Sequence, residues 1–186
     1  MKLRCYDDHI DEAVIPKSVF LAGPTARGVL RTPWRAEAIA WFEQRGFDGT
    51  VVIPEFRDGL FDQLASKVFG GATSEAAIPG MRTTSHNILS WETAGIERST
   101  VVLFWMPFAI HAEDDPRSLP GFTTRAEVSR ELQRDPKRLV LGMPDGALSS
   151  SHIRYHAHHA GVTMHRTLEE TLRAALALAT ENPGTR

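Results

Sequence analysis

The sequence predicts an α/β protein with a parallel sheet of about five strands and helices on both faces. Segments typical of strands alternate with segments typical of helices along the whole chain. The strand segments are continuous apolar runs, which is typical of a parallel sheet that is buried on both faces. The length of 186 residues favours a single domain over residues 1–186.

The first half of the chain contains two predicted strands and one predicted helix. Each strand is an apolar run that ends at a proline or a Gly-Pro pair, and the helix has apolar side chains at helical spacing. The predicted elements are a strand at 18–23, a helix at 34–46 and a strand at 50–53. Residues 55–85 are rich in Gly, Ser, Thr and Asp, and a loop of that length is commonly functional.

The second half continues the alternation to the end of the chain. The predicted elements are a helix at 86–98, a strand at 101–106, a helix at 124–133, a strand at 138–142, a short strand at 161–164 and a helix at 167–179. Thr167 and Glu170 have the spacing of a capping box at the start of the last helix.

Composition excludes several classes of protein. The formal net charge of −2 argues against a nucleic-acid-binding protein, which would carry a basic stripe. The single cysteine, Cys5, excludes an intrachain disulfide and a cysteine-based zinc site. The longest apolar run, at 101–110, is too short to span a membrane, and the first residues lack the apolar stretch of a signal peptide. These features predict a cytoplasmic globular protein with no membrane partner.

Glu127 is the strongest candidate for a catalytic residue. It follows the loop after the strand at 101–106, and such loops lie at the carboxyl ends of the strands, where ligands bind in open α/β sheets. The spacing of Thr124 and Glu127 also fits a capping box, in which the glutamate serves only the helix start. In the functional interpretation, the helix start keeps Glu127 ionised, as attack on an anomeric carbon requires, and Gly121 lets a ligand approach the backbone.

Glu92 is the second candidate carboxylate. It lies on the predicted helix at 86–98, near the boundary of the apolar stripe. A lone glutamate on a helix is usually a solvated surface residue. Two carboxylates that reach one cleft would instead divide the roles of nucleophile and acid/base between them. We expect Glu92 and Glu127 to face the same cleft.

Three further signals are weaker. The turn with Gly23, Pro24 and Arg27 could hold a phosphate or a sugar, but it fits no standard phosphate-binding motif and a plain turn is the more common explanation. Trp105 ends a strand and is the tryptophan best placed to stack on a base, although core packing is the usual role. The histidines at 152–165 lack the spacing of a metal site, so a solvated loop or a subunit contact is expected and a bound metal is not.

Several short blocks along residues 19–146 follow one another in a specific order. They are Phe-Leu-Ala-Gly-Pro at 20–24, Trp-Arg at 34–35, Val-Ile-Pro-Glu at 52–55, Trp-Glu at 91–92, Val-Leu-Phe-Trp-Met-Pro at 102–107, Pro-Gly-Phe-Thr-Thr-Arg-Ala-Glu at 120–127 and, more weakly, Arg-Tyr at 154–155. Together these blocks resemble the nucleoside 2-deoxyribosyltransferase-like family. The order of the blocks is far more specific than any single block.

The resemblance implies a flavodoxin-like doubly wound fold and an enzyme that cleaves N-glycosidic bonds of nucleosides without a cofactor. Glu127 matches the nucleophile that attacks C1′, releases the base and forms a covalent glycosyl-enzyme, from which a second base or water takes the sugar. Glu92 matches the acidic residue that helps to protonate the departing base. The expected substrate-binding residues are Gly23, Pro24, Arg27, Trp105, Gly121, Thr123, Thr124 and Tyr155. Tyr155 is a loose match that could serve a neighbouring subunit of a homo-oligomer.

Two departures from the family pattern leave the substrate open. Thr100 stands where relatives often carry an acidic residue, and residues 56–85 match no known pattern. Transfer and hydrolysis share the first half-reaction, so the motif does not separate a transferase from a hydrolase. Arg27, Arg31 and Arg35 would favour a nucleotide 5′-phosphate, or they are surface charges.

Two other functions remain as alternatives. A lysine-decarboxylase-like phosphoribohydrolase has a Pro-Gly-Gly-x-Gly-Thr-x-x-Glu motif that residues 120–127 match in part, but the second and third glycines are missing here. A non-catalytic nucleotide sensor could keep the same fold. The presence of both Glu92 and Glu127 favours an enzyme over a sensor, because a sensor has no chemical need for a nucleophile.

Overall fold

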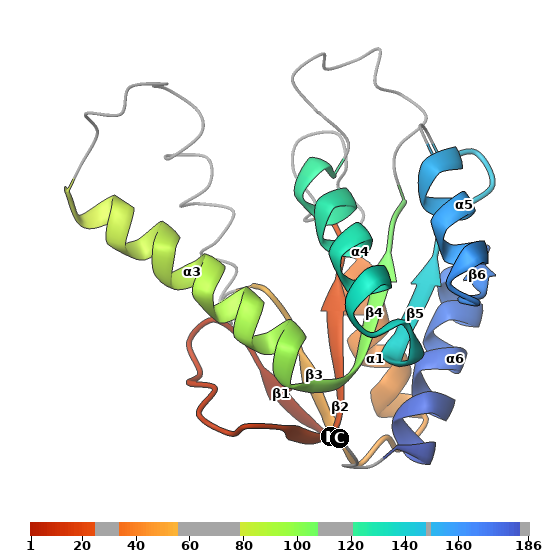
Figure 1. The fold of residues 1–186 in the computed structure, drawn as a ribbon. Helices are drawn as coiled ribbons and strands as arrows, with labels where there is room; N and C mark the ends of the chain where they lie inside the picture. Colours follow the sequence, from red (N-terminus) through yellow and green to blue (C-terminus); the bar gives the residue numbers. More distant parts are fainter. Residues whose placement is uncertain (25–33, 56–78, 108–120, 148–149, 183–186) are drawn as a thin grey trace.

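The computed structural model describes residues 1–24, 34–55, 79–107, 121–147 and 150–182, and along 79–87 it describes the backbone alone. These residues form a six-stranded sheet with the order β1-β3-β2-β4-β5-β6 (Figure 1), in which every neighbouring pair is parallel. The α/β class predicted from the sequence is therefore confirmed. The order β3-β2-β4-β5-β6 is the flavodoxin-like order, and β1 extends it at one edge.

The strands agree with the predicted apolar runs, with one addition. The strands are β1 (Lys2–Arg4), β2 (Ile15–Ala22), β3 (Thr50–Val52), β4 (Ser99–Trp105), β5 (Leu139–Gly142) and β6 (Met164–His165). The addition is β1, which no apolar run predicts because its three residues are exposed or half-buried. Backbone pairing with β3 holds β1 in the sheet, and the intrinsic β-propensity of its residues contributes little.

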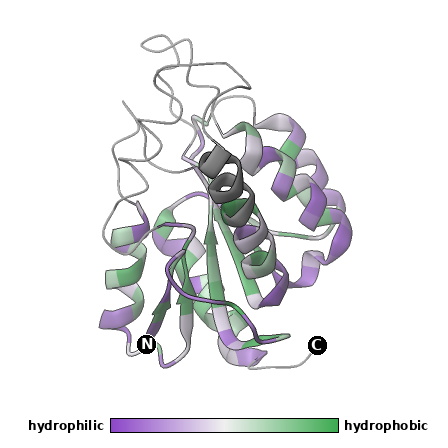
Figure 2. Cartoon of the chain, turned by 90° about the vertical axis from the view of Figure 1, so that its left-hand side faces the viewer, coloured by the Kyte–Doolittle hydropathy of each residue, from purple (hydrophilic) through white to green (hydrophobic). Residues whose placement is uncertain are grey.

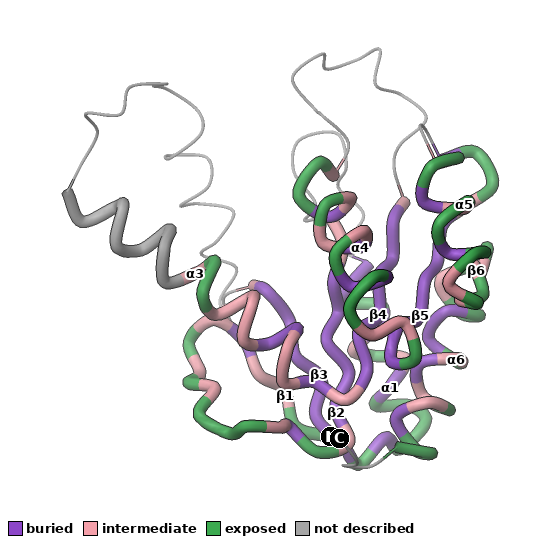
Figure 3. The backbone as a smooth tube through the Cα atoms, viewed as in Figure 1, coloured by how far each residue is buried: buried purple, intermediate pink, exposed green. Residues whose placement is uncertain are grey.

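Helices cover both faces of the sheet. They are α1 (Trp34–Gln44), α3 (Pro79–Arg98), α4 (Phe122–Arg134), α5 (Ser151–His159) and α6 (Leu168–Glu181), with a short 3-10 turn η1 (Pro136–Arg138) before β5. Side chains of α3, α4 and α5 form one core cluster with the sheet, and side chains of α1 and α6 form the other. The inner strands β2 to β5 contain most of the hydrophobic (Figure 2) and buried (Figure 3) residues of the sheet.

The carboxyl ends of β2 and β4 lie side by side at the point where the strand order reverses. Ala22 pairs with Phe104 there, and Gly23 follows with a φ of +143°. A Cβ on Gly23 would overlap the carbonyl oxygen of Trp105, so only glycine permits this approach of the two chain segments. In open α/β sheets, this reversal point is where ligands bind.

The start of α4 differs from the prediction. The helix begins at Phe122, and its N-cap is Gly121, in the left-handed region and without a side-chain cap hydrogen bond. Thr124 therefore lies inside the helix, and the predicted capping box of Thr124 and Glu127 is wrong. The capping box of Thr167 and Glu170 at α6 is confirmed in both directions.

None of the helices within the described ranges combines the length and the hydropathy of a membrane span.

Candidate functional site

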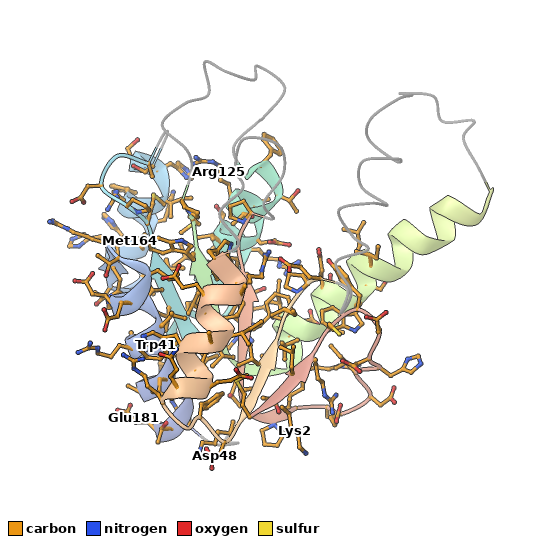
Figure 4. The ribbon with its side chains drawn as sticks, turned by 180° about the vertical axis from the view of Figure 1, so that it is seen from behind. Lys2, Trp41, Asp48, Arg125, Met164 and Glu181 are labelled. Atoms are coloured by element: carbon orange, nitrogen blue, oxygen red, sulfur yellow. The ribbon has the colours of Figure 1, made fainter. Side chains whose placement is uncertain are left out.

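The two candidate carboxylates lie on neighbouring helices of one face of the sheet. Glu92 is on the C-terminal half of α3, and Glu127 is on the second turn of α4. The charge of Glu92 contributes to the pKa of Glu127, which shows that the two side chains are within electrostatic range of each other. Arg125, two residues before Glu127, lies toward the carboxyl ends of the strands, whereas Lys2 and Asp48 lie at the opposite end (Figure 4).

Burial dominates the protonation of Glu127. The pKa of Glu127 is raised from 4.5 to about 7, first by desolvation and second by the charge of Glu92. Arg130 and Arg35 act in the opposite direction, with smaller effects. The start of α4 therefore does not lower the pKa of Glu127 as predicted, because desolvation and the charge of Glu92 raise it.

Glu92 has a partner from the other end of the chain. The hydroxyl of Tyr6 donates a hydrogen bond to Oε1 of Glu92. Burial first, and then the charge of Glu92, raise the pKa of Tyr6 above its usual value, so the phenol keeps its proton and remains a donor. The Tyr6 ring also packs edge-on against Trp91, with 5.0 Å between the ring centroids.

Arg35 ties together the strand ends beneath the carboxylates. Its guanidinium is buried, donates to the carbonyl oxygens of Leu21 (3.0 Å) and Gly23 (2.6 Å), and pairs with Glu55 at 2.6 Å. The indole of Trp34 donates to the carbonyl oxygen of Pro24 at 3.2 Å. The turn at Gly23 and Pro24 is thus fixed from below by two adjacent residues of α1. Because the Arg35 guanidinium already has three partners, it acts as a structural clamp here.

A buried ion pair holds α4 against the start of β4. Glu131 is fully buried, and its carboxylate pairs with Arg138 at 2.5 Å. Arg138 also donates to the carbonyl oxygen of Ser99 at 3.1 Å. Glu131 is one helical turn after Glu127, so this pair sets the rotation of α4 and therefore the direction of the Glu127 side chain.

The other residues predicted to bind substrate are distributed unevenly. Gly121 and Thr123 lie at the start of α4, where Thr123 is exposed, while Thr124 is buried on the same turn. Trp105 is 7% exposed and packs in the core with α1 and α6. Stacking of its ring on a base therefore finds no support in this geometry. Arg27 lies outside the described residues, as does the rest of the segment at 25–33.

The histidine group and Tyr155 lie on a helix and not in the predicted loop. Helix α5 carries His152, His156, His158 and His159, all exposed, and Tyr155 stacks on His159 with 4.1 Å between the ring centroids. Among the residues that the structure describes, no group of three or more His, Cys, Asp or Glu side chains could hold a metal ion. Tyr155 is 59% exposed, and its expected role at a neighbouring subunit stays a prediction.

Sequence reasoning missed Tyr6 and the clamp formed by Arg35 and Glu55. Arg35 and Glu55 are part of the Trp-Arg and Val-Ile-Pro-Glu blocks. The position of Glu55 just after a predicted strand was the signal that could have indicated the clamp. Tyr6 had no such signal. It reaches Glu92 only because β1 joins the edge of the sheet and the chain then turns back toward α3.

The arrangement can provide two carboxyl groups in different protonation states. With a pKa of about 7, Glu127 keeps its proton in a large fraction of the molecules near neutral pH, although the charge of Glu92 is close by. One carboxylate is then available for attack or proton abstraction, and one carboxylic acid is available to donate a proton.

The sequence was compared with protein-family models and with curated proteins. No protein-family model matches the sequence. Among curated proteins, none matches it significantly.

Proposed function

We propose that the protein cleaves the N-glycosidic bond of a nucleoside or nucleotide, with Glu127 as the nucleophile. The observation that carries the proposal is the electrostatic coupling of Glu127 to Glu92, two half-buried carboxyl groups. A pair of neighbouring carboxyl groups, one of which keeps a proton near neutrality, is typical of glycosidic chemistry. The ordered blocks at 20–24, 91–92 and 120–127 point to the same reaction by resemblance.

The proposed reaction proceeds in two steps. In the first, Glu127 passes its proton to Glu92, and a carboxylate oxygen of Glu127 bonds to C1′ of the sugar. The C1′–N bond breaks with its electron pair going to the base, and Glu92 gives the proton to the base. In the second, water or an acceptor base attacks C1′, Glu92 takes up the proton of the attacking group, and the ester to Glu127 breaks. The same two residues serve both steps, with Glu92 changing from acid to base.

Base release from a panel of deoxynucleosides, ribonucleosides and their 5′-nucleotides tests the proposal. We expect wild-type protein to release base from at least one member and Glu127→Gln to lose at least about 10³-fold of that rate. Glu37→Gln, on the exposed side of α1, is the matched control and should keep the wild-type rate. Undiminished base release by Glu127→Gln would overturn the assignment of the nucleophile.

Two further readouts distinguish the outcomes of the same experiment. Base release without an acceptor identifies a hydrolase, and exchange that requires an added acceptor base identifies a transferase. Mass spectrometry of the quenched reaction should find a glycosyl adduct on the peptide that contains Glu127. Binding of a nucleotide without base release under any condition would favour the non-catalytic sensor.

A further inference from the structure

The segment between β1 and β2, residues 5–14, is held against α3 by contacts with two side chains of that helix. The indole of Trp91 donates to the carbonyl oxygen of Asp8 at 2.7 Å, and Arg98 donates to the carbonyl oxygen of Ile10. The side chain of Ile10 packs on the core cluster of the α3 face. The N-terminal segment thus runs along the C-terminal half of α3, as the red loop in Figure 1 shows.

Tyr6 is the residue of this segment that reaches the candidate site. Its backbone N–H donates to the carbonyl oxygen of Glu55 at 3.0 Å, which fixes the segment to the end of β3. Its ring packs against Trp91, and its hydroxyl donates to Glu92, one residue further along α3. Backbone, ring and hydroxyl of Tyr6 therefore each have a defined contact.

We propose that Tyr6 is a positioning residue for Glu92. The N-terminal segment, residues 5–14, thereby contributes a side chain to the candidate site. This proposal deepens the proposed function and rests on it for the catalytic consequence. A phenol hydroxyl can donate to a carboxylate and can accept from a carboxylic acid. Tyr6 can therefore hold the Glu92 carboxyl in one orientation before and after Glu92 transfers its proton, which the two-step reaction requires.

The hydroxyl also influences where the shared proton resides. Donation by Tyr6 stabilises negative charge on Glu92 and so leaves the proton on Glu127 in the free protein. Among the described residues, the other charged groups with a resolved effect on Glu127 are Arg35 from α1, and Arg130 and Glu131 from α4 itself. These three groups remain when the Tyr6 hydroxyl is removed, so a change in proton distribution would be due to the hydroxyl.

Carboxyl titration of Tyr6→Phe in the full-length chain tests the proposal without any activity measurement. With ¹³C-labelled glutamate carboxyls, assigned through Glu127→Gln and Glu92→Gln, the wild-type Glu127 carboxyl should titrate near pH 7. In Tyr6→Phe, part of the change in this pH range should move from the Glu127 signal to the Glu92 signal. A Glu127 titration that Tyr6→Phe leaves unaltered would overturn the proposal.

Glu12→Gln is the matched control within the same segment. It weakens a half-exposed ion pair with Arg4 at the edge of the sheet and leaves the Tyr6 hydroxyl and its acceptor Glu92 chemically unchanged. We expect it to keep the wild-type titration of Glu127 and the wild-type rate. An equal effect of Glu12→Gln and Tyr6→Phe would show that loosening of the segment, and not the hydroxyl, is responsible.

Kinetics separate a positioning role from a merely structural one. The Phe side chain keeps the ring packing against Trp91, so Tyr6→Phe should keep the melting temperature close to that of wild type. We expect kcat for base release to fall by ~10- to 100-fold while KM changes little, because orientation of Glu92 matters in bond breaking. An unchanged kcat would contradict the proposal.

If wild-type protein releases no base from any substrate, the proposed function fails, and the titration still decides the role of Tyr6.

A second measurement avoids the Tyr6 variant altogether. The chain contains two tyrosines, so the ¹³Cζ signal of Tyr6 can be distinguished from that of Tyr155. Glu92→Gln replaces the charged acceptor with a neutral one, and we expect the Tyr6 signal to shift while the Tyr155 signal stays in place. A Tyr6 signal that does not respond to Glu92→Gln would rule out the contact.

Discussion

Desolvation of Glu127 raises its pKa and also makes the folded protein less stable when the carboxyl is ionised. The folded protein binds a proton at Glu127 more tightly than the unfolded chain does, because the pKa is raised from 4.5 to about 7. Between these two values the unfolded state has already released the proton that the folded state retains. The free energy of unfolding therefore falls as pH rises through this interval, and the Glu127 contribution levels off above it.

Glu127→Gln should raise the stability of the protein at pH 8 by up to about 3.5 kcal/mol, while abolishing base release. The neutral amide avoids the desolvation of an ionised carboxylate, and the magnitude follows from about 1.4 kcal/mol per unit of pKa shift. At pH 4, where the carboxyl is mostly protonated in both states, the two proteins should have similar stability. Urea unfolding at both pH values is the measurement.

Glu37→Gln again serves as the control, because an exposed carboxylate on α1 loses little hydration on folding and its replacement should change stability equally at both pH values. If Glu127→Gln were less stable than wild type at pH 8, the ionised carboxylate would be stabilised in the folded protein. The raised pKa of Glu127 would then be incorrect.

At the level of elements, the contact between the ends of β2 and β4 allows the site to form. Gly23 combines a φ of +143° with a position that a side chain would share with the carbonyl oxygen of Trp105. The carbonyl oxygen of Gly23 itself accepts from Arg35 at 2.6 Å. Gly23 therefore determines the backbone turn, the contact between β2 and β4 and the hydrogen bond from Arg35. A substitution at Gly23 should disturb all three.

Gly23→Ala should destabilise the protein by about 3 kcal/mol or more, since a rigid backbone carbonyl cannot move aside as a flexible side chain can. Gly46→Ala is a matched control with a φ of +65° and no atom within 4 Å of the added Cβ. It should cost only the backbone strain of about 1–2 kcal/mol. Thermal unfolding of both variants gives the comparison, and equal losses would show that contact with Trp105 is unimportant.

Elements with a strong local pattern could be predicted, and elements held by tertiary contacts could not. The apolar run of β4 and the capping box of α6 carry their own signals, and the structure confirms both. Helix α5 has only Ile153 and Ala157 buried, which is too little for an apolar periodicity. The start of α4 was misplaced because its cap is the backbone of Gly121, whereas sequence reasoning looked for a side-chain cap.

In the whole molecule, the candidate site assembles from three separate stretches of sequence. Glu127 and Glu92 were predictable as candidates from the blocks around them, and electrostatic coupling supports their proximity. The contact between Tyr6 and Glu92 joins residues that are 86 positions apart. No local pattern encodes such a contact, because it depends on β1 pairing with β3 and on the path of residues 5–14 over α3.

Docking of the N-terminal segment can be followed through Cys5. This residue is the single cysteine of the chain, is 0% exposed, and has its backbone N–H bonded to the Asp8 carboxylate at 2.9 Å. Since β1 lies at the edge of the strands that the structure describes, its segment should open more easily than the central strands.

We therefore expect a thiol reagent such as dithionitrobenzoate to label Cys5 slowly in native protein and faster at urea concentrations below the main unfolding transition. Labelled Cys5 cannot return to its buried position, so Tyr6 should be unable to reach Glu92, and base release should fall in proportion to the labelled fraction. Cys5→Ala protein treated in the same way should keep its activity.

Labelling only in step with global unfolding would show that the segment does not open separately. Full activity of labelled protein would show that base release does not require the docked N-terminal segment.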